Sequence, residues 1–360
     1  MFKSLYKRFF PTPHFISAPS FGVDISEESL RFVELVNTRH GIRLGKYGEV
    51  KIPKGVIESG KIIKPNVLQE ILVKIKKEQG VKSVRVSLPE EQIYLFKLRL
   101  EKDGLKNIKE GVELCLEEHV PVPAPEAVFD YEILNETEKF LEIQVAVVQK
   151  NITEGYLSIF ESSGISVSAF EFEAQSIARA VIKEGDLDTY MIVDFGENRT
   201  GISIVSHGVI MFTSTLDVGG EMLTNLIQKN FKIGFEEAEK IKKQHGLQRN
   251  AVNKEMFSVL LNGVSILRDE IGKHFIYWHT HKDEFGKDNP PIKKIILCGG
   301  NSNLIGLSEY FSITMKNSVE LANVWINILN VEKIIPEINF EQSLSFVVAL
   351  GLALGNFKND

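Results

Sequence analysis

The chain has 360 residues, a net charge of −6, and 43% hydrophobic against 25% charged residues. This composition is typical of a globular protein with more than one core, and the acidic balance, with no block of Lys and Arg, argues against nucleic-acid binding. The two cysteines, Cys115 and Cys298, stand in no metal-type spacing and favour a reducing cytoplasm, and no apolar run reaches the ~18 residues of a membrane span.

Residues 1–20 predict an N-terminal tail. The tail is cationic and aromatic as far as Pro11, and Pro13 and Pro19 stiffen the part that follows. Two interpretations stay open at this point. The tail is either disordered or packed on its own domain, or it touches an anionic membrane surface.

The first folded stretch begins with a short buried strand that ends at Asp24 and leads into a polar loop. The helix that follows begins after Pro65, which suits a helix start, and the next strand ends at Pro89. The predicted elements are the strands 21–24, 30–35, 42–52 and 84–88 and the helix 66–79.

The stretch from residue 91 to residue 163 has a different texture and reads as a compact α+β insertion. Its predicted elements are the strands 92–100, 128–134 and 140–148 and the helices 105–119 and 151–162. A strand over 166–172 and a helix over 175–183 then return the chain to the main framework.

A second Asp-bearing hairpin repeats the pattern of the first. The apolar residues 191–193 end at Asp194, Gly196 permits a tight turn, and alternating strands cover 202–205 and 209–215. Gly219 and Gly220 then introduce a helix over 221–231. Because this order occurs twice, about 170 residues apart, we expect duplicated halves that face each other across a cleft.

The remaining third of the chain is largely helical. In the helix 235–243, Glu239 and Lys242 are three residues apart and read first as a solvated surface pair. A helix over 254–281 carries three histidines whose spacing does not suit a metal site. A strand ends at Gly299, Gly300 and Asn301, and helices over 304–311 and 343–356 follow.

In combination these motifs resemble the actin-like ATPase superfamily, and within it the type IV pilus assembly protein PilM family, over residues 20–357. The stretches that carry the resemblance are G-V-D-I-x-x-x-S-L-R-F-V-E-L, H-V-P-V-P, F-D-Y-E-I-L, D-V-G-G-E-x-L-T, I-I-L-C-G-G-N and V-A-L-G-L-A-L. The resemblance implies an α/β, actin-like two-lobed fold of duplicated halves with an inserted α+β subdomain. The implied subdomains are 1A (21–90, 164–189 and 340–360), 1C (91–163), 2A (190–230 and 291–339) and a mostly helical 2B (231–290).

The resemblance also implies a site for ATP and Mg²⁺ between the lobes. Asp24 and Asp194 would hold Mg²⁺ through water, and Glu173 would orient the attacking water unless it faces solvent or caps a helix. The residues implied around the phosphates are Ser26, Ser29, Gly196 and Thr200, and those around ribose and adenine are Gly219, Gly220, Glu239, Lys242, Gly299, Gly300 and Asn301.

The first phosphate loop departs from the family pattern. Relatives usually show D-I-G-S-S-S, whereas this chain has D-I-S-E-E-S from Asp24 to Ser29. At a positive φ, Ser26 would cost roughly 1–2 kcal/mol. A carboxylate about 4 Å from a phosphate charge repels it by about 4 kcal/mol at a dielectric of 20. We therefore expect nucleotide binding to be weakened and hydrolysis to be doubtful.

By resemblance, the protein is a cytoplasmic scaffold at the inner face of the cytoplasmic membrane, which it contacts only peripherally. Its expected partners are the cytoplasmic N-terminal peptide of a PilN-like inner-membrane protein and other platform proteins, with no nucleic acid. The peptide groove would lie between the insertion and the main domain, at an edge supplied by strand 92–100 or 140–148. The alternatives are an FtsA-like filament-forming tether and an active ATPase or sugar kinase. The tether is disfavoured because FtsA-type tethers carry a C-terminal amphipathic membrane helix after a linker, whereas this sequence stops at Asp360.

Overall fold

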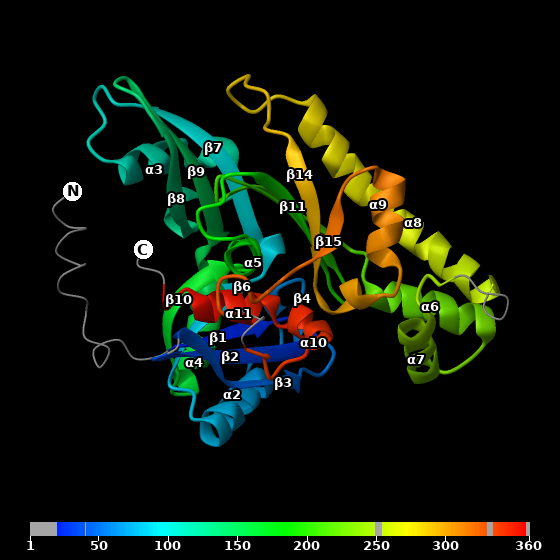
Figure 1. Cartoon of the computed structure of the whole chain (residues 1–360). Helices are drawn as coiled ribbons and strands as arrows, with labels where there is room; N and C mark the ends of the chain where they lie inside the picture. Colours follow the sequence, from blue (N-terminus) through cyan, green and yellow to red (C-terminus); the bar gives the residue numbers. More distant parts are fainter. Residues whose placement is uncertain (1–19, 40, 249–253, 330–333, 358–360) are drawn as a thin grey trace.

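The computed structural model describes residues 20–39, 41–248, 254–329 and 334–357, and it has two lobes (Figure 1). Each lobe is built on a five-stranded sheet, ordered β10-β6-β1-β2-β3 in lobe 1 and β13-β12-β11-β14-β15 in lobe 2. In lobe 1 the strands are β1 (Phe21–Ile25), β2 (Ser29–Thr38), β3 (Gly41–Lys51), β6 (Ser83–Leu88) and β10 (Ser166–Phe172). In lobe 2 they are β11 (Thr189–Phe195), β12 (Thr200–Ser206), β13 (Val209–Leu216), β14 (Ile292–Cys298) and β15 (Val319–Leu321).

The two sheets have the same pairing pattern. In lobe 1, β1 is antiparallel to β2 and parallel to β6, which is in turn parallel to β10, and β2 is antiparallel to β3. In lobe 2, β11 is antiparallel to β12 and parallel to β14, which is parallel to β15, and β12 is antiparallel to β13. This repeat confirms the predicted duplicated halves, with Asp24 and Asp194 at equivalent places near the ends of β1 and β11.

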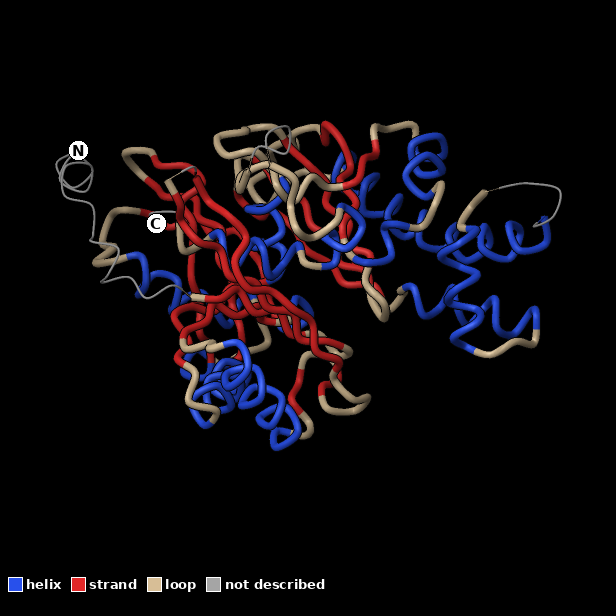
Figure 2. The backbone as a smooth tube through the Cα atoms, turned by 60° about the horizontal axis from the view of Figure 1, so that its bottom comes forward, coloured by secondary structure: helices blue, strands red, loops and turns tan. Residues whose placement is uncertain are grey.

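Helices α5 (Glu173–Val181) and α11 (Val347–Leu354) form the layer between the lobes (Figure 1). Helices α2 (Pro65–Gln79) and α4 (Lys150–Ser162) cover the outer side of the lobe 1 sheet, where Figure 2 shows helices gathered below the strands. In lobe 2, α6 (Gly220–Phe231), α8 (Lys254–Thr280) and α9 (Leu307–Met315) cover the sheet, and α7 (Phe235–His245) packs on α6. Each sheet therefore buries both of its faces, which explains the near-continuous apolar runs in β1 and β11.

Close packing in the middle layer depends on small residues. All eight residues of α11 are buried. A Cβ on Gly351 would collide with the carbonyl oxygen of Ser176 in α5, and a Cβ on Gly22 in β1 would collide with the carbonyl oxygen of Ala349. The run of Ala and Gly in α11 thus lets one helix contact a neighbouring helix and a strand at backbone distance.

The insertion is a three-stranded antiparallel sheet in the order β7-β9-β8, formed by β7 (Ile93–Glu101), β8 (Ala127–Glu136) and β9 (Phe140–Gln149). Helix α3 (Ile108–His119) packs on one face of this sheet. Because β9 is paired on both sides, the prediction that strand 140–148 supplies an open edge is wrong. The edges of this sheet are β7 and β8.

Several of the predicted helices have different bounds, and two of them differ most. The C-terminal helix predicted over 343–356 is split at Phe346 into α10 (Phe340–Ser345) and α11. The helix predicted from residue 304 begins at Leu307, because the η3 turn (Gly300–Asn303) comes first. The remaining short elements are β4 (Ile57–Glu58), β5 (Lys61–Ile62), η1 (Glu90–Gln92) and η2 (Ala124–Glu126).

Residues 1–19 of the predicted tail lie outside the described residues. Within the described ranges, no helix has both the length and the hydropathy that crossing a bilayer requires.

Candidate functional site

A cleft between the lobes collects carboxylates from strand ends. Asp24 lies near the end of β1, Glu90 follows β6 and Glu173 follows β10, so three adjacent parallel strands direct their carboxyl ends to one place. Asp194, at the end of β11, enters from lobe 2, and all four side chains line one cavity of about 180 Å³. This volume is below the ~300 Å³ at which most small-molecule sites begin.

The structure places some of the residues predicted for the nucleotide site in the wall of this cavity and leaves the others out of it. Those that line the cavity are Asp24, Ser26, Ser29, Glu173, Asp194, Gly196, Gly299, Gly300 and Asn301. Those that do not are Thr200, Gly219, Gly220, Glu239 and Lys242.

Asp24 is held by two neighbours. Ser87 donates its hydroxyl to Asp24 Oδ1 at 2.9 Å, and the Arg31 guanidinium lies 4.0 Å from Asp24 Oδ2. Burial raises the pKa of Asp24, and Arg31 and Ser87 offset only part of that effect. The cleft therefore disfavours a full negative charge even at its best-supported carboxylate.

The other buried acids behave in the same way. Burial and the charge of Asp24 raise the pKa of Asp194 to about 6, and burial raises the pKa of Glu90 to about 7. Ala174 donates its backbone N–H to Glu90 Oε2 at 3.1 Å, which offsets only part of the effect of burial. Burial, followed by the charges of Asp24 and Glu90, raises the pKa of Glu173 well above its ordinary value.

Carboxylates outnumber cations around the cavity. Arg31 and Arg199 are the cationic side chains that line it. Arg199, from the β11–β12 turn of lobe 2, pairs with Glu91 of lobe 1 and lies 3.6 Å from Glu27 Oε1, so it bridges the lobes. Eight carboxylates line the cavity, namely Asp24, Glu27, Glu28, Glu90, Glu91, Glu173, Asp194 and Glu197.

The first phosphate loop closes on itself. Ser26 does not have a positive φ, so the expected backbone strain is absent. Its hydroxyl accepts from the Ser29 backbone N–H at 3.2 Å, and its backbone N–H donates to the Ser29 carbonyl at 2.9 Å. Glu28 remains turned toward the cleft, where burial and then the charges of Glu197 and Glu221 raise its pKa. The departure from the family loop is therefore electrostatic and not conformational.

The start of α6 is already occupied by protein groups. The backbone N–H groups of Gly220 and Glu221 donate to the carbonyls of Gly196 and Glu197, at 3.0 and 2.8 Å. A Cβ on Gly219 would collide with the Glu197 carbonyl, so the second loop lies directly on the glycine pair. In this arrangement those N–H groups are not available to a phosphate.

Lys242 fixes the same region from behind. Its ammonium lies 2.7 Å from Glu239 Oε2 and donates to the Gly220 carbonyl and to Asn301 Oδ1, both at 3.0 Å. Asn301 in turn donates its amide to the Gly196 carbonyl at 3.0 Å. Because Lys242 is only 2% exposed, its interpretation as part of a solvated surface pair is wrong.

A second, apolar groove of about 400 Å³ lies between the insertion and lobe 1, where Leu95, Ala146, Leu157 and Phe172 are among its lining residues. The start of β13 in lobe 2 also reaches it, through Val209 and Ile210. Its volume falls in the range of ~300–1,000 Å³ that is common for binding sites.

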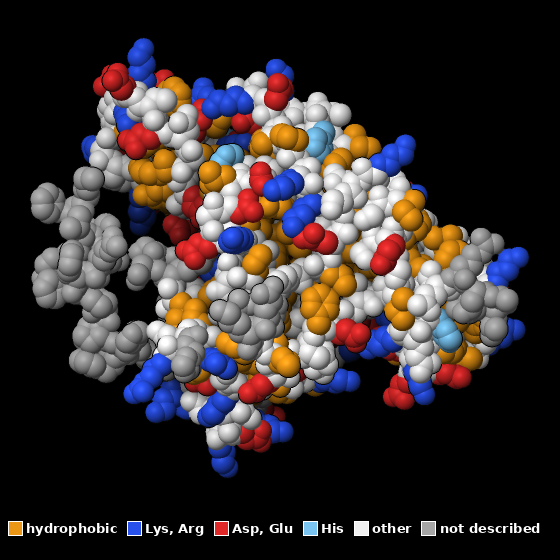
Figure 3. Space-filling model, viewed as in Figure 1, with side chains coloured by type: hydrophobic (Ala, Val, Ile, Leu, Met, Phe, Trp, Pro, Cys, Tyr) orange, Lys and Arg blue, Asp and Glu red, His pale blue; other side chains and the backbone are white. Residues whose placement is uncertain are grey.

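The polar groups of this groove are mostly acceptors. Gln144 is 4% exposed, and its Oε1 has no hydrogen-bond partner among the described residues. The lining side chains include four carboxylates, of Asp130, Glu132, Glu154 and Glu171, and no Lys or Arg. Apolar side chains gather on the insertion at the upper left of Figure 3, with acidic side chains just below them. An occupant of the groove should therefore be apolar and should carry N–H donors.

Comparison with known proteins agrees with this architecture. The sequence model described as "Type IV pilus assembly protein PilM" matches residues 22–357. The chain belongs to the PilM family. A solved "PilM-PilN type IV pilus biogenesis complex" superposes with a TM-score of 0.78 at 20% identity, covering 95% of this chain and 99% of that one.

More distant relatives share the two-lobed fold. MreB5 of Spiroplasma citri bound to ADP superposes with a TM-score of 0.54 at 16% identity, covering 86% of this chain and 93% of that one. The ethanolamine utilization protein EutJ of Escherichia coli (strain K12) is 32% identical over 155 residues, which are 43% of this chain and 48% of EutJ. The chain thus spans about half the length of this curated relative, and it spans a smaller share of the length of other curated relatives.

Membership of the PilM family does not by itself locate the residues that shape the cleft. Sequence reasoning missed Arg199, Glu90 and Glu91. A signal was present for the two glutamates, because they directly follow Pro89 at the end of a strand parallel to β1. No sequence signal marks Arg199, since its partners lie more than 100 residues away in the other lobe.

Proposed function

We propose that this PilM-family protein is an actin-like scaffold of the inner-membrane platform of a type IV pilus or a related secretion machine. It works on the cytoplasmic side and contacts the membrane only peripherally, through partners. Its apolar groove binds the short cytoplasmic tail of a PilN-like membrane protein. The observation that carries this proposal is the buried, unpartnered Gln144 Oε1 inside an apolar groove between the insertion and lobe 1.

An extended peptide suits the groove for two reasons. Strand β8 is an edge of the insertion sheet and lines the groove with five consecutive residues, from Val128 to Glu132, so a peptide can add to it as a further strand. A peptide N–H or amide group would also satisfy Gln144 Oε1, whose isolation costs about 1–3 kcal/mol. The likeness to a PilM that was solved together with PilN supports a PilN-like partner.

We also propose that the interlobe cleft is a weakened nucleotide site. Its cavity is small, its carboxylates outnumber its guanidinium groups eight to two, and the N–H groups at the start of α6 are engaged. Among the described residues, no group of three or more His, Cys, Asp or Glu side chains is arranged to hold a metal ion. These residues do not fit a triphosphate, whose negative charge would meet eight carboxylates and only two guanidinium groups.

A groove substitution tests the peptide proposal. The probe is a fluorescein-labelled synthetic peptide of the cytoplasmic tail of the PilN-like protein from the same organism, followed by anisotropy. Val128 is 42% exposed in the groove, so Val128→Asp should weaken binding at least tenfold, by adding a charge to an apolar and acidic surface. The matched control is Leu114→Asp on α3, where the side chain is 78% exposed and lies outside the groove.

The control should bind the peptide within twofold of the wild type. Equal affinities for wild type and Val128→Asp would reject the groove as the binding site. Calorimetry with Mg-ATP tests the second proposal, and we expect a Kd above about 1 mM, equivalent to less than about 4 kcal/mol. A micromolar Kd would contradict it.

A further inference from the structure

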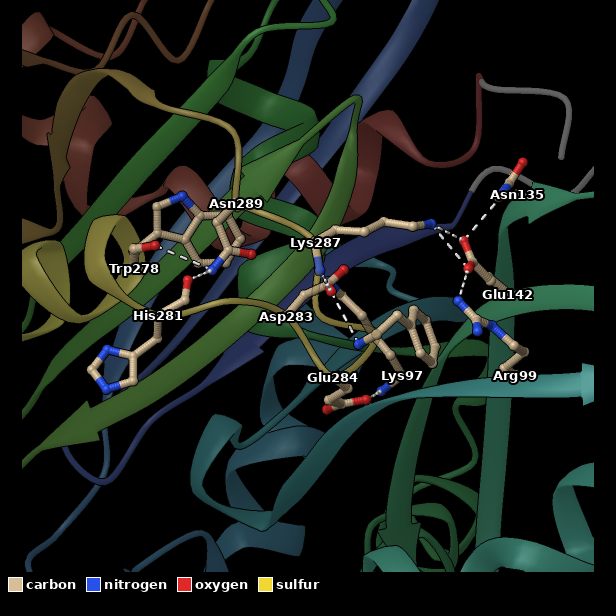
Figure 4. A network of polar contacts seen from close by, with 11 residues as sticks. Lys97, Arg99, Asn135, Glu142, Trp278, His281, Asp283, Glu284, Lys287 and Asn289 are labelled. Carbon is tan, nitrogen blue, oxygen red and sulfur yellow. Dashed lines mark hydrogen bonds and ion pairs between the residues drawn. The ribbon is translucent and has the colours of Figure 1, made fainter.

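The loop between α8 and β14, residues 281–289, leaves lobe 2 and lies against the insertion sheet (Figure 4). We call it the clamp loop. Lys97 of β7 donates its backbone N–H to Glu284 Oε2 at 2.9 Å, and its ammonium lies 3.3 Å from Asp283 Oδ2. Lys287 reaches across to Glu142 of β9 and donates to both carboxylate oxygens, at 2.7 and 2.9 Å. These contacts join lobe 2 to the insertion through residues that do not line the interlobe cavity.

The charges on the insertion side of this contact are buried. Glu142 is 3% exposed, and it also accepts from Arg99 at 2.6 Å and from Asn135 at 3.2 Å. Burial alone would raise the pKa of Glu142, but the donors around it, with Lys287 first, outweigh burial and lower the pKa to about 2. The ring of Phe285 lies over the Arg99 guanidinium, 4.4 Å from its central carbon to the ring centre. Because Glu142 is buried and accepts from several donors, its contact with Lys287 differs from an ordinary exposed ion pair at the surface.

The clamp loop holds its own shape. Asp283 Oδ1 accepts from the backbone N–H groups of Phe285 and Lys287, at 3.0 and 2.8 Å. Asn289 donates its amide to the carbonyls of Trp278 and His281, at 3.1 and 2.9 Å, which ties the loop to the end of α8. These bonds lie within lobe 2. They fix the conformation in which the clamp loop presents Phe285 and Lys287 to the insertion.

The clamp loop and the groove use the same face of the insertion sheet. In the pairing register, Lys97 is opposite Gln144 and Arg99 is opposite Glu142, while Leu95, two residues before Lys97, is opposite Ala146. Side chains two residues apart on a strand point to the same face. Leu95, Ala146 and Gln144 line the groove, so the groove wall continues directly into the clamp contacts.

Lobe 2 also touches the groove through β13, where Val209 and Ile210 line it. Two separate segments of lobe 2 therefore meet the insertion, and lobe 1 supplies the opposite wall with Leu157 and Phe172. A change in the angle between the lobes would displace Val209 and Ile210 or strain the clamp contacts.

From these contacts we propose that the clamp loop sets the shape of the peptide groove, so that peptide affinity depends on the arrangement of the two lobes. This inference rests on the proposed function of the groove. A peptide that prefers the clamped arrangement stabilises it, and by linkage anything that closes or opens the interlobe cleft changes peptide affinity by the same factor. Lys97, Glu142, Phe285 and Lys287 are then positioning residues, since they shape the groove without lining it.

The test is the double substitution Phe285→Ala with Lys287→Ala in the full chain. It removes the contacts of the Phe285 and Lys287 side chains with the insertion. Glu142 still accepts from Arg99 and Asn135, so no buried charge is left without a partner. We expect five- to thirtyfold weaker binding of the labelled tail peptide, the range that a coupling of about 1–2 kcal/mol gives. The single substitution Lys287→Arg, which keeps a cation opposite Glu142, should retain the wild-type peptide affinity within twofold. The matched control is Lys273→Ala, which removes an exposed ion pair with Glu270 on α8.

Amide hydrogen exchange separates this inference from the proposed function. In the double variant, exchange should rise about tenfold both in the clamp loop and in residues 127–136, which form β8 beside the groove. Faster exchange in the clamp loop alone would overturn the inference, as would wild-type peptide affinity in the double variant while Val128→Asp still loses binding. If the wild type fails to bind the peptide, the proposed function fails, and the exchange pattern of β8 still decides whether the clamp loop controls the groove.

Discussion

The acidic character of the interlobe cleft predicts that reversing one charge will improve nucleotide binding. Glu28 lines the cavity and has a pKa raised by burial and by the charges of Glu197 and Glu221. Coulomb's law gives about 2 kcal/mol for two unit charges ~8 Å apart at a dielectric of 20. Glu28→Lys changes the local charge by two, and at 0.15 M salt, with a Debye length of about 8 Å, roughly a third of that ~4 kcal/mol survives. We therefore expect about tenfold tighter binding of Mg-ATP.

The assay is displacement of a fluorescent ATP analogue at low and at high salt. Glu28→Gln should give about half of the gain in free energy, because it changes the local charge by one unit and not by two. The control is Glu78→Lys, which makes the same change in net charge on the exposed side of α2. The reasoning is refuted if Glu28→Lys and Glu78→Lys shift the affinity equally, or if the gain from Glu28→Lys does not shrink as salt rises.

Three further predictions concern stability, each measured by urea unfolding. Lys242→Ala should lower the free energy of unfolding by about 3–5 kcal/mol because it breaks a buried ion pair. Its control, Lys243→Ala, removes a 71% exposed side chain and should lower it by less than about 1 kcal/mol. Similar losses in the two variants would contradict the buried network. Burial raises the pKa of Glu90 from 4.5 to about 7, so the folded state binds the proton more tightly than the unfolded state does. The free energy of unfolding of the wild type should therefore fall by about 3 kcal/mol as pH rises from about 4.5 to 7. Glu90→Gln should lack that loss, and equal pH slopes for the two proteins would show that Glu90 does not titrate in this range. Gly351→Ala should cost about 1–3 kcal/mol by overpacking, while Gly272→Ala, which meets open space in α8, should be neutral or stabilising by up to about 1 kcal/mol; equal effects would mean that α11 can move away from α5.

Local patterns were enough to predict most of the elements. Apolar runs that end in Asp24 and Asp194, with glycines and prolines between them, predicted both hairpins to within a few residues. The same patterns failed where a contact with another segment decides the structure. The final helix is broken at Phe346, and α5 begins two residues before the predicted start, so that Glu173 lies in its first turn beside the cleft.

The candidate sites were less predictable than the elements. Lys242 read as a surface cation because its neighbours in α7 are polar, and only the packing of α7 against the glycine pair and Asn301 buries it. The resemblance placed the groove between the insertion and the main domain, but its residues could not be named, since its walls come from the insertion, lobe 1 and the start of β13. Such sites depend on contacts between residues that are far apart in the chain.

The sequence by itself determined the duplicated two-lobed architecture, because alternation, strand ends and turn residues are local properties that each half carries in its own segment. Tertiary structure alone decided which charges are buried, which glycines face a backbone, and that one loop of lobe 2 holds the insertion. The physical reason is that burial and ion pairing depend on distance in space. A pair such as Lys287 and Glu142 is 145 residues apart in sequence and 2.7 Å apart in the folded chain.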